Sequence, residues 1–470
     1  MLAFLDKSRS VARPGYSKWL IPPAALAVHL SIGQVYAFSV FKTSLIAHFG
    51  SSQTAVAWIF SIAIVMLGLS AAVLGTWVER VGPRKAMVAA ALCWGSGFLV
   101  GSLGIALDSL PILYLGYGVI GGIGLGIGYI SPVSTLIKWF PDRPGLATGM
   151  AIMGFGGGAL IASPATNKLL GVFDPGFSPD DKNAVANGTA LASTFLTLGT
   201  IYVVFMLIGA ALVRVPPGYA EGEESVQQPG RNGALVRASQ AIRTPQFALL
   251  WIVLFCNVTA GIGILEQAAP MIQDFFRSGG GTSSVSAAEA AGFVGMLSLA
   301  NMAGRFVWSS LSDLIGRKPT YMIYLGVGLV LYVLLATVGQ QSTAIFVILA
   351  LVIISYYGGG FATVPAYLKD LFGTLEVGAI HGRLLTAWAA AGVVGPLIVN
   401  GFLDAAGEPG KLVADDYHLG LFTMVGVLGV GFVANLLIRP VEEKHFDKEA
   451  VRAGCRDAPD QQAAMARGGN

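Results

Sequence analysis

The sequence predicts an all-α membrane protein whose twelve transmembrane helices form two halves of six. Of 470 residues, 54% are hydrophobic and only 12% are charged, whereas a soluble domain carries about 25% charged residues. Runs without Asp, Glu, Lys or Arg recur along the chain, and a helix needs about 20 such residues to cross a bilayer core about 30 Å thick. A polar segment, 214–245, separates two groups of these runs.

The predicted spans follow one another in order along the chain. Seven charge-free runs hold one span each: 19–41, 86–107, 109–137, 144–167, 244–265, 384–403 and 417–438. Segments 43–78 and 183–213 each add one span, and 319–368 folds back at GQQS to give two. The last span is 287–312, which carries Arg305. The total is twelve.

The order of spans and polar segments predicts five parts: a tail at 1–18, a six-helix bundle at 19–213, a linker at 214–245, a second bundle at 246–438 and a tail at 439–470. Lys and Arg accumulate in loops that stay in the cytoplasm. With the N-terminus inside, only five of the 29 Lys and Arg residues lie on the outer side. We therefore expect a multi-pass protein of the cell membrane, plasma or inner, with both termini cytoplasmic.

The composition also argues against several functions. The first apolar run starts near Trp19, is long enough to span and lacks a small-residue cleavage site, so it is predicted to remain as a span. Three cysteines and five histidines are scattered along the chain, which predicts no metal site, no cofactor and no catalytic constellation. The net charge of +3 is accounted for by the inner loops. We expect a protein of the lipid bilayer that is not an enzyme and binds no nucleic acid.

The string GYGVIGGIGLGIG at 116–128 matches the GxGxxG pattern of a dinucleotide-binding loop. That fingerprint must follow a strand and open a helix in water, and here it lies inside the charge-free run 109–137. Gly118, Gly122 and Gly126 repeat at helical spacing, which lets neighbouring helices approach closely. We interpret these glycines as helix-packing positions.

One loop is repeated between the two halves. After span 2 the chain reads GTWVERVGPRK and after span 8 it reads SSLSDLIGRK, with an acid and a glycine recurring at one offset of 234 residues. The first copy resembles the GxxxDRxGRR loop of the major facilitator superfamily, although Glu79 replaces the usual Asp. The resemblance implies twelve helices around a central site, and structural or gating roles for Gly75, Glu79, Arg80, Gly82 and Arg84 and for Asp313, Gly316 and Arg317.

Other stretches resemble the oxalate/formate antiporter family within that superfamily. They are WFPDRPGLATG at 139–149, RTPQF at 243–247, SIGQVYAFSVF at 31–41 and KDLFGTLEVGAIHGRLLTAWAAAG at 369–392. The stretch in span 1 is also similar to the related monocarboxylate transporters. The resemblance implies a secondary active transporter that moves a small carboxylate anion by alternating access, together with protons or against a counter-anion.

Arg305 is the residue that best indicates a substrate site. It precedes Asp313 by eight residues, which at about 1.5 Å per residue puts it roughly 12 Å into the membrane. A guanidinium at that depth is costly and marks a substrate or ion pathway, or else an ion pair or a side chain that snorkels inward. Arg binds a carboxylate through two parallel hydrogen bonds. Asn301, one turn earlier on the same face, is expected to add a donor and an acceptor.

Aromatic residues are expected to close the site. Tyr36 in span 1, Tyr129 in span 4 and Tyr356 with Tyr357 in span 10 lie near its predicted depth. Each of them could equally be a packing tyrosine. Tyr129 and Tyr356 are the preferred phenols, because their spans resemble the substrate-lining helices of the family.

The number of cations limits the predicted substrate. One Arg suits one carboxylate, whereas oxalate carries two negative charges, and an unpaired charge in a low-dielectric cavity is expensive. The oxalate-handling branch is expected to have a Lys in span 11, where this chain reads LLTAWAAAG with Trp388. We therefore favour lactate, pyruvate or formate as the substrate. The alternatives are an oxalate/formate exchanger and a carboxylate sensor that does not transport.

Two residues are candidates for coupling transport to protons. His29 in span 1 titrates in the useful range if it is unperturbed, although a lone membrane histidine often serves only as a packing hydrogen bonder. Glu266 lies near the outer end of span 7. The animal-type carriers are expected to use a Lys in span 1 and an Asp in span 8, where this chain has Val40 and Asn301. Their proton mechanism cannot simply be carried over.

Overall fold

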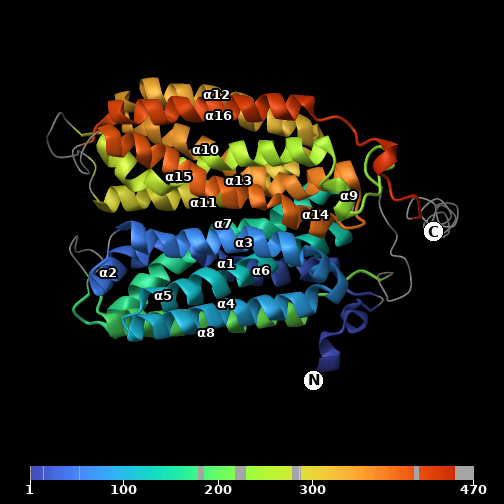
Figure 1. Cartoon of the computed structure of the whole chain (residues 1–470), viewed down its shortest axis with the longest axis horizontal. Coiled ribbons are helices and arrows are strands. Elements are labelled where there is room, and N and C mark those ends of the chain that lie inside the picture. The colour runs from blue at the N-terminus through green and yellow to red at the C-terminus, as the bar shows by residue number, and fades with distance from the viewer. Residues whose placement is uncertain are drawn as a thin grey trace.

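The chain is helical in the computed structural model, which describes residues 2–13, 15–51, 53–140, 142–177, 185–217, 229–277, 285, 287–406 and 412–449. Within these ranges the β structure amounts to one parallel bridge between Val11 and Val215. The long helices lie side by side in two stacked halves (Figure 1). The predicted all-α class is confirmed.

Each half is built from one half of the sequence. The first contains α1 (Ile21–Ile32), α2 (Ser39–Phe49), α3 (Gln53–Val81), α4 (Pro83–Ala106), α5 (Leu110–Leu113), α6 (Gly122–Trp139), α7 (Pro144–Phe173) and α8 (Gly188–Leu212). The second contains α9 (Ala238–Ala241), α10 (Pro245–Phe275), α11 (Ala287–Ile315), α12 (Arg317–Val338), α13 (Thr343–Phe372), α14 (Val377–Leu384), α15 (Thr386–Ala406) and α16 (His418–Leu437).

Eleven helical stretches in the described residues are long and apolar enough to cross a membrane. The eleven do not include α11, which carries Glu289, Arg305 and Asp313. α11 nevertheless packs between α7 and α13. α11 is therefore part of the helical bundle, while the count of twelve spans stays a prediction.

Three predicted spans are not continuous α-helices. Span 1 is α1 and α2 joined by the 3-10 segment η4 (Gly33–Ala37), span 4 contains the π-helical segment η5 (Tyr114–Gly121), and span 11 is divided into α14 and α15. The break in span 1 lies where the chain crosses α7. A Cβ added at Gly33 would lie 3.0 Å from the Cα of Phe155, so only glycine permits this approach.

The repeated loop has the same backbone shape in both halves. Gly82 and Gly316 precede α4 and α12 and have φ angles of 84° and 91°. Glycine adopts such angles without the steric cost that a Cβ brings. The offset of 234 residues therefore marks two turns that are structurally equivalent.

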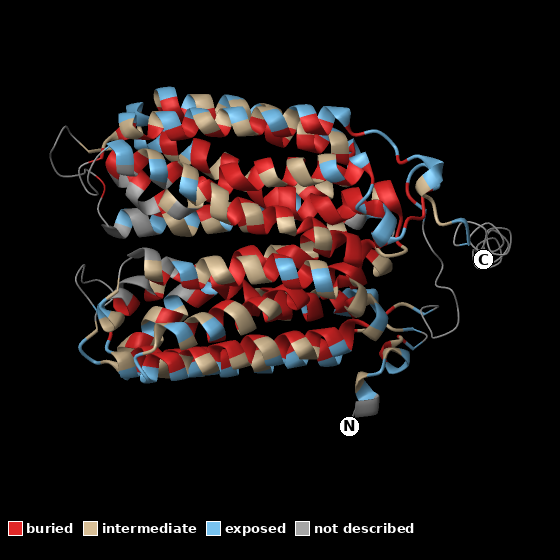
Figure 2. Ribbon diagram, in the orientation of Figure 1, coloured by how far each residue is buried: buried red, intermediate tan, exposed pale blue. Residues whose placement is uncertain are grey.

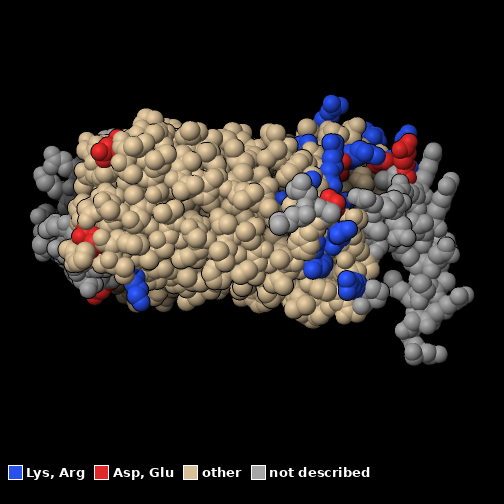
Figure 3. Space-filling view, turned by 90° about the horizontal axis from the view of Figure 1, so that it is seen from below, with Lys and Arg blue, Asp and Glu red and all other residues tan. Residues whose placement is uncertain are grey.

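The two halves meet mainly toward one end of the molecule. The first and last described segments of the chain lie at this end (Figure 1), and Lys and Arg side chains gather there (Figure 3), so we call it the basic end. α7 packs against α11, and α3 packs against α14 and α15. Cβ atoms added at Gly149 and Gly75 would lie 3.0 Å from the Arg305 carbonyl oxygen and 2.9 Å from the Ala379 Cα. Buried residues are densest in this region (Figure 2).

Candidate functional site

The two repeated acids make different contacts at the basic end. The Glu79 carboxylate pairs with the Lys138 ammonium at 2.7 Å, within its own half. The Asp313 carboxylate accepts hydrogen bonds at 2.9 and 2.8 Å from the backbone N–H groups of Gly145 and Leu146. These groups open α7, so the second acid joins the end of α11 to the positive end of a helix in the other half.

The basic residues of the repeated loops also differ. Arg317 forms an ion pair of 2.5 Å with Asp313. Arg84 donates to the carbonyl oxygens of Phe4 and Arg9 at 2.7 and 3.2 Å, and so holds the N-terminal segment. Arg80 is exposed. Gating roles for these residues remain a proposal.

Arg305 lies between the two halves with one nitrogen of its guanidinium, Nη2, unpaired among the described residues. The side chain is 0% exposed. Its Nε donates to Oδ1 of Asn301 at 2.9 Å, and its Nη1 donates to the Ile152 carbonyl at 3.4 Å. Nη2 is buried without a hydrogen-bond partner among the described residues. Because an unpaired buried donor costs about 1–3 kcal/mol, this nitrogen is suited to an acceptor that the protein does not provide.

Aromatic rings from both halves cover the guanidinium. Its Cζ lies 5.5 Å from the ring centroid of Phe155 in α7 and 5.3 Å from that of Phe361 in α13. The fully buried Trp388 of α15 lies 5.4 and 4.6 Å from these two rings. The rings attract the cation through their π faces and exclude water around it. Neither phenylalanine was predicted from the sequence.

Two of the predicted tyrosines line this site. The Tyr129 and Tyr36 rings lie 5.5 and 5.0 Å from the Phe155 ring, and both hydroxyls interact electrostatically with Arg305. The Tyr36 hydroxyl is 3.3 Å from the Tyr357 hydroxyl. The Tyr129 hydroxyl is buried without a hydrogen-bond partner in the described part of the chain.

Tyr356 faces away from these tyrosines. Its ring packs at 5.1 Å against Trp308 and at 5.7 Å against Tyr324. Its neighbour Tyr357 is the residue of the pair that meets Tyr36 and interacts with Arg305. The contacts of Tyr357 therefore support a place in the site better than those of Tyr356, which the sequence had favoured.

The two candidates for proton coupling differ in what the structure describes. His29 is 0% exposed, and its Nε2 lies 3.2 Å from the Tyr129 carbonyl oxygen. Its Nδ1 has no hydrogen-bond partner among the described residues. Glu266 lies in α10, but its side chain is outside the described part of the structure.

A second buried histidine was missed by the sequence analysis. His381 of α14 is 2% exposed, and its ring lies 5.8 Å from the Tyr129 ring. Both of its ring nitrogens are without hydrogen-bond partners within the described ranges. His29 contacts the same tyrosine from the first half, at 5.6 Å. His381 precedes the predicted span 384–403, with Arg383 between them, so the sequence did not mark it as a buried residue.

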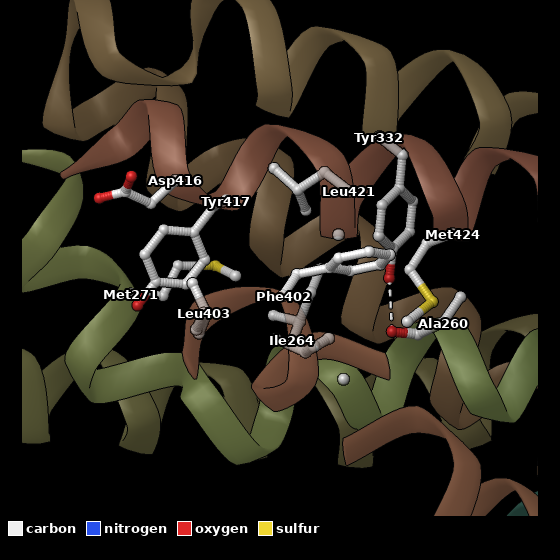
Figure 4. A pocket seen from close by; sticks show the side chains of 13 residues that line it. Ala260, Ile264, Met271, Tyr332, Phe402, Leu403, Asp416, Tyr417, Leu421 and Met424 are labelled. Atoms are coloured by element: carbon white, nitrogen blue, oxygen red, sulfur yellow. Dashed lines mark hydrogen bonds between the residues drawn. The ribbon is translucent and has the colours of Figure 1, made fainter. Parts of the chain in front are cut away.

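A separate pocket inside the second half is not suited to a substrate. It lies between α10, α15 and α16 and has a volume of about 10 Å³ (Figure 4), which is about enough for one water molecule. The Tyr332 hydroxyl at its edge is already satisfied by the Ala260 carbonyl at 2.7 Å. We regard this pocket as a packing gap. The described residues also contain no group of three or more His, Cys, Asp or Glu that could hold a metal ion.

Two helical halves with a buried and incompletely paired cation between them are the arrangement of a secondary transporter. Residues 24–396 match the family model of the Major Facilitator Superfamily, with a second match at 283–456. The chain belongs to this superfamily. It is a multi-pass membrane transporter and not an enzyme.

Curated relatives match most of the chain. An uncharacterized superfamily-type transporter, YhjX of Escherichia coli, is 26% identical over 369 residues, covering 78% of this chain and 83% of that protein. The oxalate:formate antiporter of Oxalobacter formigenes is 26% identical over 373 residues, with coverage of 79% and 81%. The apicoplast pyruvate carrier 1 of Toxoplasma gondii is 23% identical over 437 residues, with coverage of 84% and 77%. The predicted resemblance is confirmed.

Solved structures share the fold. The E. coli fucose:proton symporter superposes with a TM-score of 0.65 at 15% identity, covering 90% of this chain and 100% of that chain. A bacterial homologue of the iron transporter ferroportin gives 0.63 at 14% identity, with coverage of 89% and 98%.

Proposed function

We propose that the protein moves a small monocarboxylate such as lactate, pyruvate or formate across the cell membrane by alternating access, coupled to protons. The unpaired Nη2 of the buried Arg305 guanidinium between the two halves is the observation that carries this proposal. A carboxylate there accepts two parallel charge-assisted hydrogen bonds. Asn301 fixes the guanidinium through Nε, and the hydroxyls of Tyr36, Tyr129 and Tyr357 are available to a hydroxyl or keto oxygen of the anion.

The charge of the site supports a monoanion. The buried Lys and Arg side chains within the described ranges are Arg84, Arg305 and Arg317. Arg84 and Arg317 are engaged at the basic end by backbone carbonyls and by Asp313. One cation therefore faces the substrate, and a second carboxylate would lie among aromatic rings without a partner, which is costly.

Oxalate/formate exchange is the second candidate. The similarity to the oxalate:formate antiporter, over 79% of this chain, favours it. It requires the second carboxylate of oxalate to be held by hydroxyl and ring N–H donors alone, and Tyr129 and Trp388 have such groups unpaired among the described residues.

We assign proton coupling to His29, which is buried beside the site, with Glu266 as the other candidate. His29 stacks edge-on against Tyr129, whose hydroxyl interacts with Arg305. Imidazole exchanges protons near neutral pH when water reaches it. The proposed cycle therefore needs His29 to become hydrated in at least one of its states.

Uptake of labelled lactate, pyruvate, formate and oxalate into proteoliposomes tests the function. We expect an inward proton gradient to stimulate uptake of a monocarboxylate by the native protein, and Arg305→Ala to abolish it. Arg305→Lys keeps a charge without the planar fork, so we expect uptake to fall by roughly tenfold or more. Arg243→Ala, an exposed cation at the basic end, is the control. Oxalate uptake that requires internal formate would support the exchanger, and flux unaffected by Arg305→Ala would overturn both.

A further inference from the structure

A cationic cavity lies at the basic end of the second half, away from Arg305. It has a volume of about 290 Å³ and is lined by the end of α13 at Asp370 and by three further segments that are distant in the sequence. They are the linker at Arg231 and Asn232, the start of α12 at Arg317 and Lys318, and the chain after α16 at Arg439. Asn232 ties the linker to the last segment by donating to the Val441 carbonyl at 2.8 Å.

The charge of this cavity is strongly unbalanced. Its lining contains four cations, Arg231, Arg317, Lys318 and Arg439, and one acid, Asp370. Asp370 Oδ2 lies 3.0 Å from Nε of Arg231 and 3.4 Å from Nε of Arg317, so one carboxylate is shared by two guanidinium groups. Asp313 also pairs with Arg317 from outside the lining, so two acids face four cations.

Donors in the cavity remain unused. Lys318 directs its ammonium at the carbonyls of Leu436 and Ile438, at 2.8 and 2.9 Å, and an ammonium has three donors. Arg317 is only 4% exposed, yet its Nε has no hydrogen bond of good geometry in the described part of the chain. Arg231 lies over the turn that opens α12, since a Cβ added at Gly316 would be 3.8 Å from its Nη1. The N-terminus of this 22-residue helix adds partial positive charge.

The equivalent position in the first half is covered by the chain itself. The residue equivalent to Lys318 at the offset of 234 is Arg84. Arg84 is covered by the N-terminal segment: it donates to the Phe4 and Arg9 carbonyls, and its Cζ lies 4.2 Å from the Phe4 ring centroid. Its third acceptor is the Val213 carbonyl at the end of α8, as Leu436 and Ile438 at the end of α16 are for Lys318. Lys318, in contrast, lines the cavity.

We propose that this cavity binds a phosphate group, either the headgroup of an anionic phospholipid or a soluble phosphate. Arg and Lys together provide forked and point-charge donors of the kind that phosphate oxygens accept. The cavity opens at the basic end, which by the positive-inside rule faces the leaflet richest in anionic lipid. Arg317 also pairs with Asp313, the acid that caps α7 across the halves. A bound phosphate therefore shares a guanidinium with the contact that holds the basic end together.

Thermal unfolding of the purified full chain tests the proposal without any transport assay. Inorganic phosphate, compared with chloride at equal ionic strength, is titrated in detergent. Nanodiscs of phosphatidylglycerol are compared with nanodiscs of phosphatidylcholine. A ligand that binds the folded state raises Tm in a concentration-dependent way. Stabilisation by phosphatidylglycerol alone identifies the lipid headgroup, and stabilisation by inorganic phosphate identifies a soluble ligand.

Variants locate the site. Arg439 is exposed, and Arg439→Ala is expected to weaken phosphate binding roughly tenfold. Arg231→Gln is a second variant with the same expectation. Arg243→Ala, at the same end but outside the cavity lining, is expected to respond like the native chain. Absence of stabilisation by both probes, or equal responses of Arg439→Ala and Arg243→Ala, would overturn the proposal. Neither result bears on carboxylate transport.

Discussion

Asn301 holds Arg305 by accepting a hydrogen bond from its Nε at 2.9 Å, one helical turn away on α11. The amide is neutral, so it orients the guanidinium without neutralising it. No Asp or Glu forms an ion pair with Arg305 in the described part of the chain. The positive charge therefore remains available to an anion.

A carboxylate in place of the Asn301 amide should form an ion pair with the Arg305 guanidinium. We expect Asn301→Asp to reduce monocarboxylate uptake by about tenfold or more, because the new anion competes with substrate for the guanidinium. Initial uptake rates over a range of substrate concentrations measure this as a loss at low concentration. Asn301→Ala removes the acceptor without adding charge and is expected to lose less. Equal losses in the two variants would mean that charge competition is not the cause.

Removal of the Asp313 carboxylate should loosen the basic end. Asp313→Ala removes two hydrogen bonds to the start of α7, each worth about 1.5–3 kcal/mol to a charged acceptor. Ser309 is 0% exposed at this interface, so Ser309→Cys in a chain without other cysteines reports opening by its rate of labelling. We expect faster labelling with Asp313→Ala.

The equivalent acid of the first loop is the matched control for that experiment. Glu79 binds Lys138 within its own half, so Glu79→Ala should increase labelling of Ser309→Cys less than Asp313→Ala does. The asymmetry of the two acids would be contradicted by a larger effect of Glu79→Ala.

The crossing of η4 and α7 should not tolerate a methyl group. Gly33→Ala places a Cβ against the Phe155 backbone, and such overpacking costs about 1–3 kcal/mol. Thermal unfolding in detergent should show a lower Tm. Gly429→Ala in α16 is the control, since nothing lies within 4 Å of its added Cβ, and Ala favours a helix interior over Gly by about 0.5–1 kcal/mol. A Tm for Gly33→Ala that matches or exceeds the native value would refute the close approach.

Substitution of the two histidines beside Tyr129 should remove proton-coupled uptake without removing substrate exchange. His29 belongs to the first half and His381 to the second, and both have buried ring nitrogens without partners among the described residues. We expect His29→Gln, His381→Gln or both to abolish stimulation by a proton gradient while exchange of labelled for unlabelled substrate continues. His445→Gln, outside the spans, should behave like the native chain. If His29→Gln, His381→Gln and the double variant all retain gradient stimulation, the proton is carried elsewhere.

The fold could be predicted because its signals are local. Charge-free runs, a polar segment in the middle and a repeated loop indicated two helical halves, and the motif resemblance identified the family. Gly82 and Gly316 were recognised as a pair by sequence offset, and their shared positive φ explains why both are glycine. The breaks at η4 and η5 gave no comparable signal, because a charge-free run looks the same whether its helix is regular or not.

The site was predicted less completely, because its parts come from different helices. Arg305 and Asn301 share one helix, so their contact followed from spacing. Phe155, Phe361 and Trp388 lie in three other helices, and which face of a membrane helix points inward is weakly marked when all its faces are apolar. Tyr356 and Tyr357 are adjacent in sequence and point in different directions, and only the packing of α13 distinguishes them.

Arg305 and one of the two rings that cover it belong to different halves of the molecule: Arg305 is carried by α11, and Phe155 by α7. In the proposed alternating-access cycle the halves separate at this place, and water enters between the Phe155 ring and the guanidinium. An ion pair at 4 Å is worth about 4 kcal/mol at an effective dielectric of 20 and about 1 kcal/mol in bulk water. Hydration alone would then lower the affinity for the anion. The guanidinium need not move for substrate to leave, because the solvent that opens the path also weakens the bond.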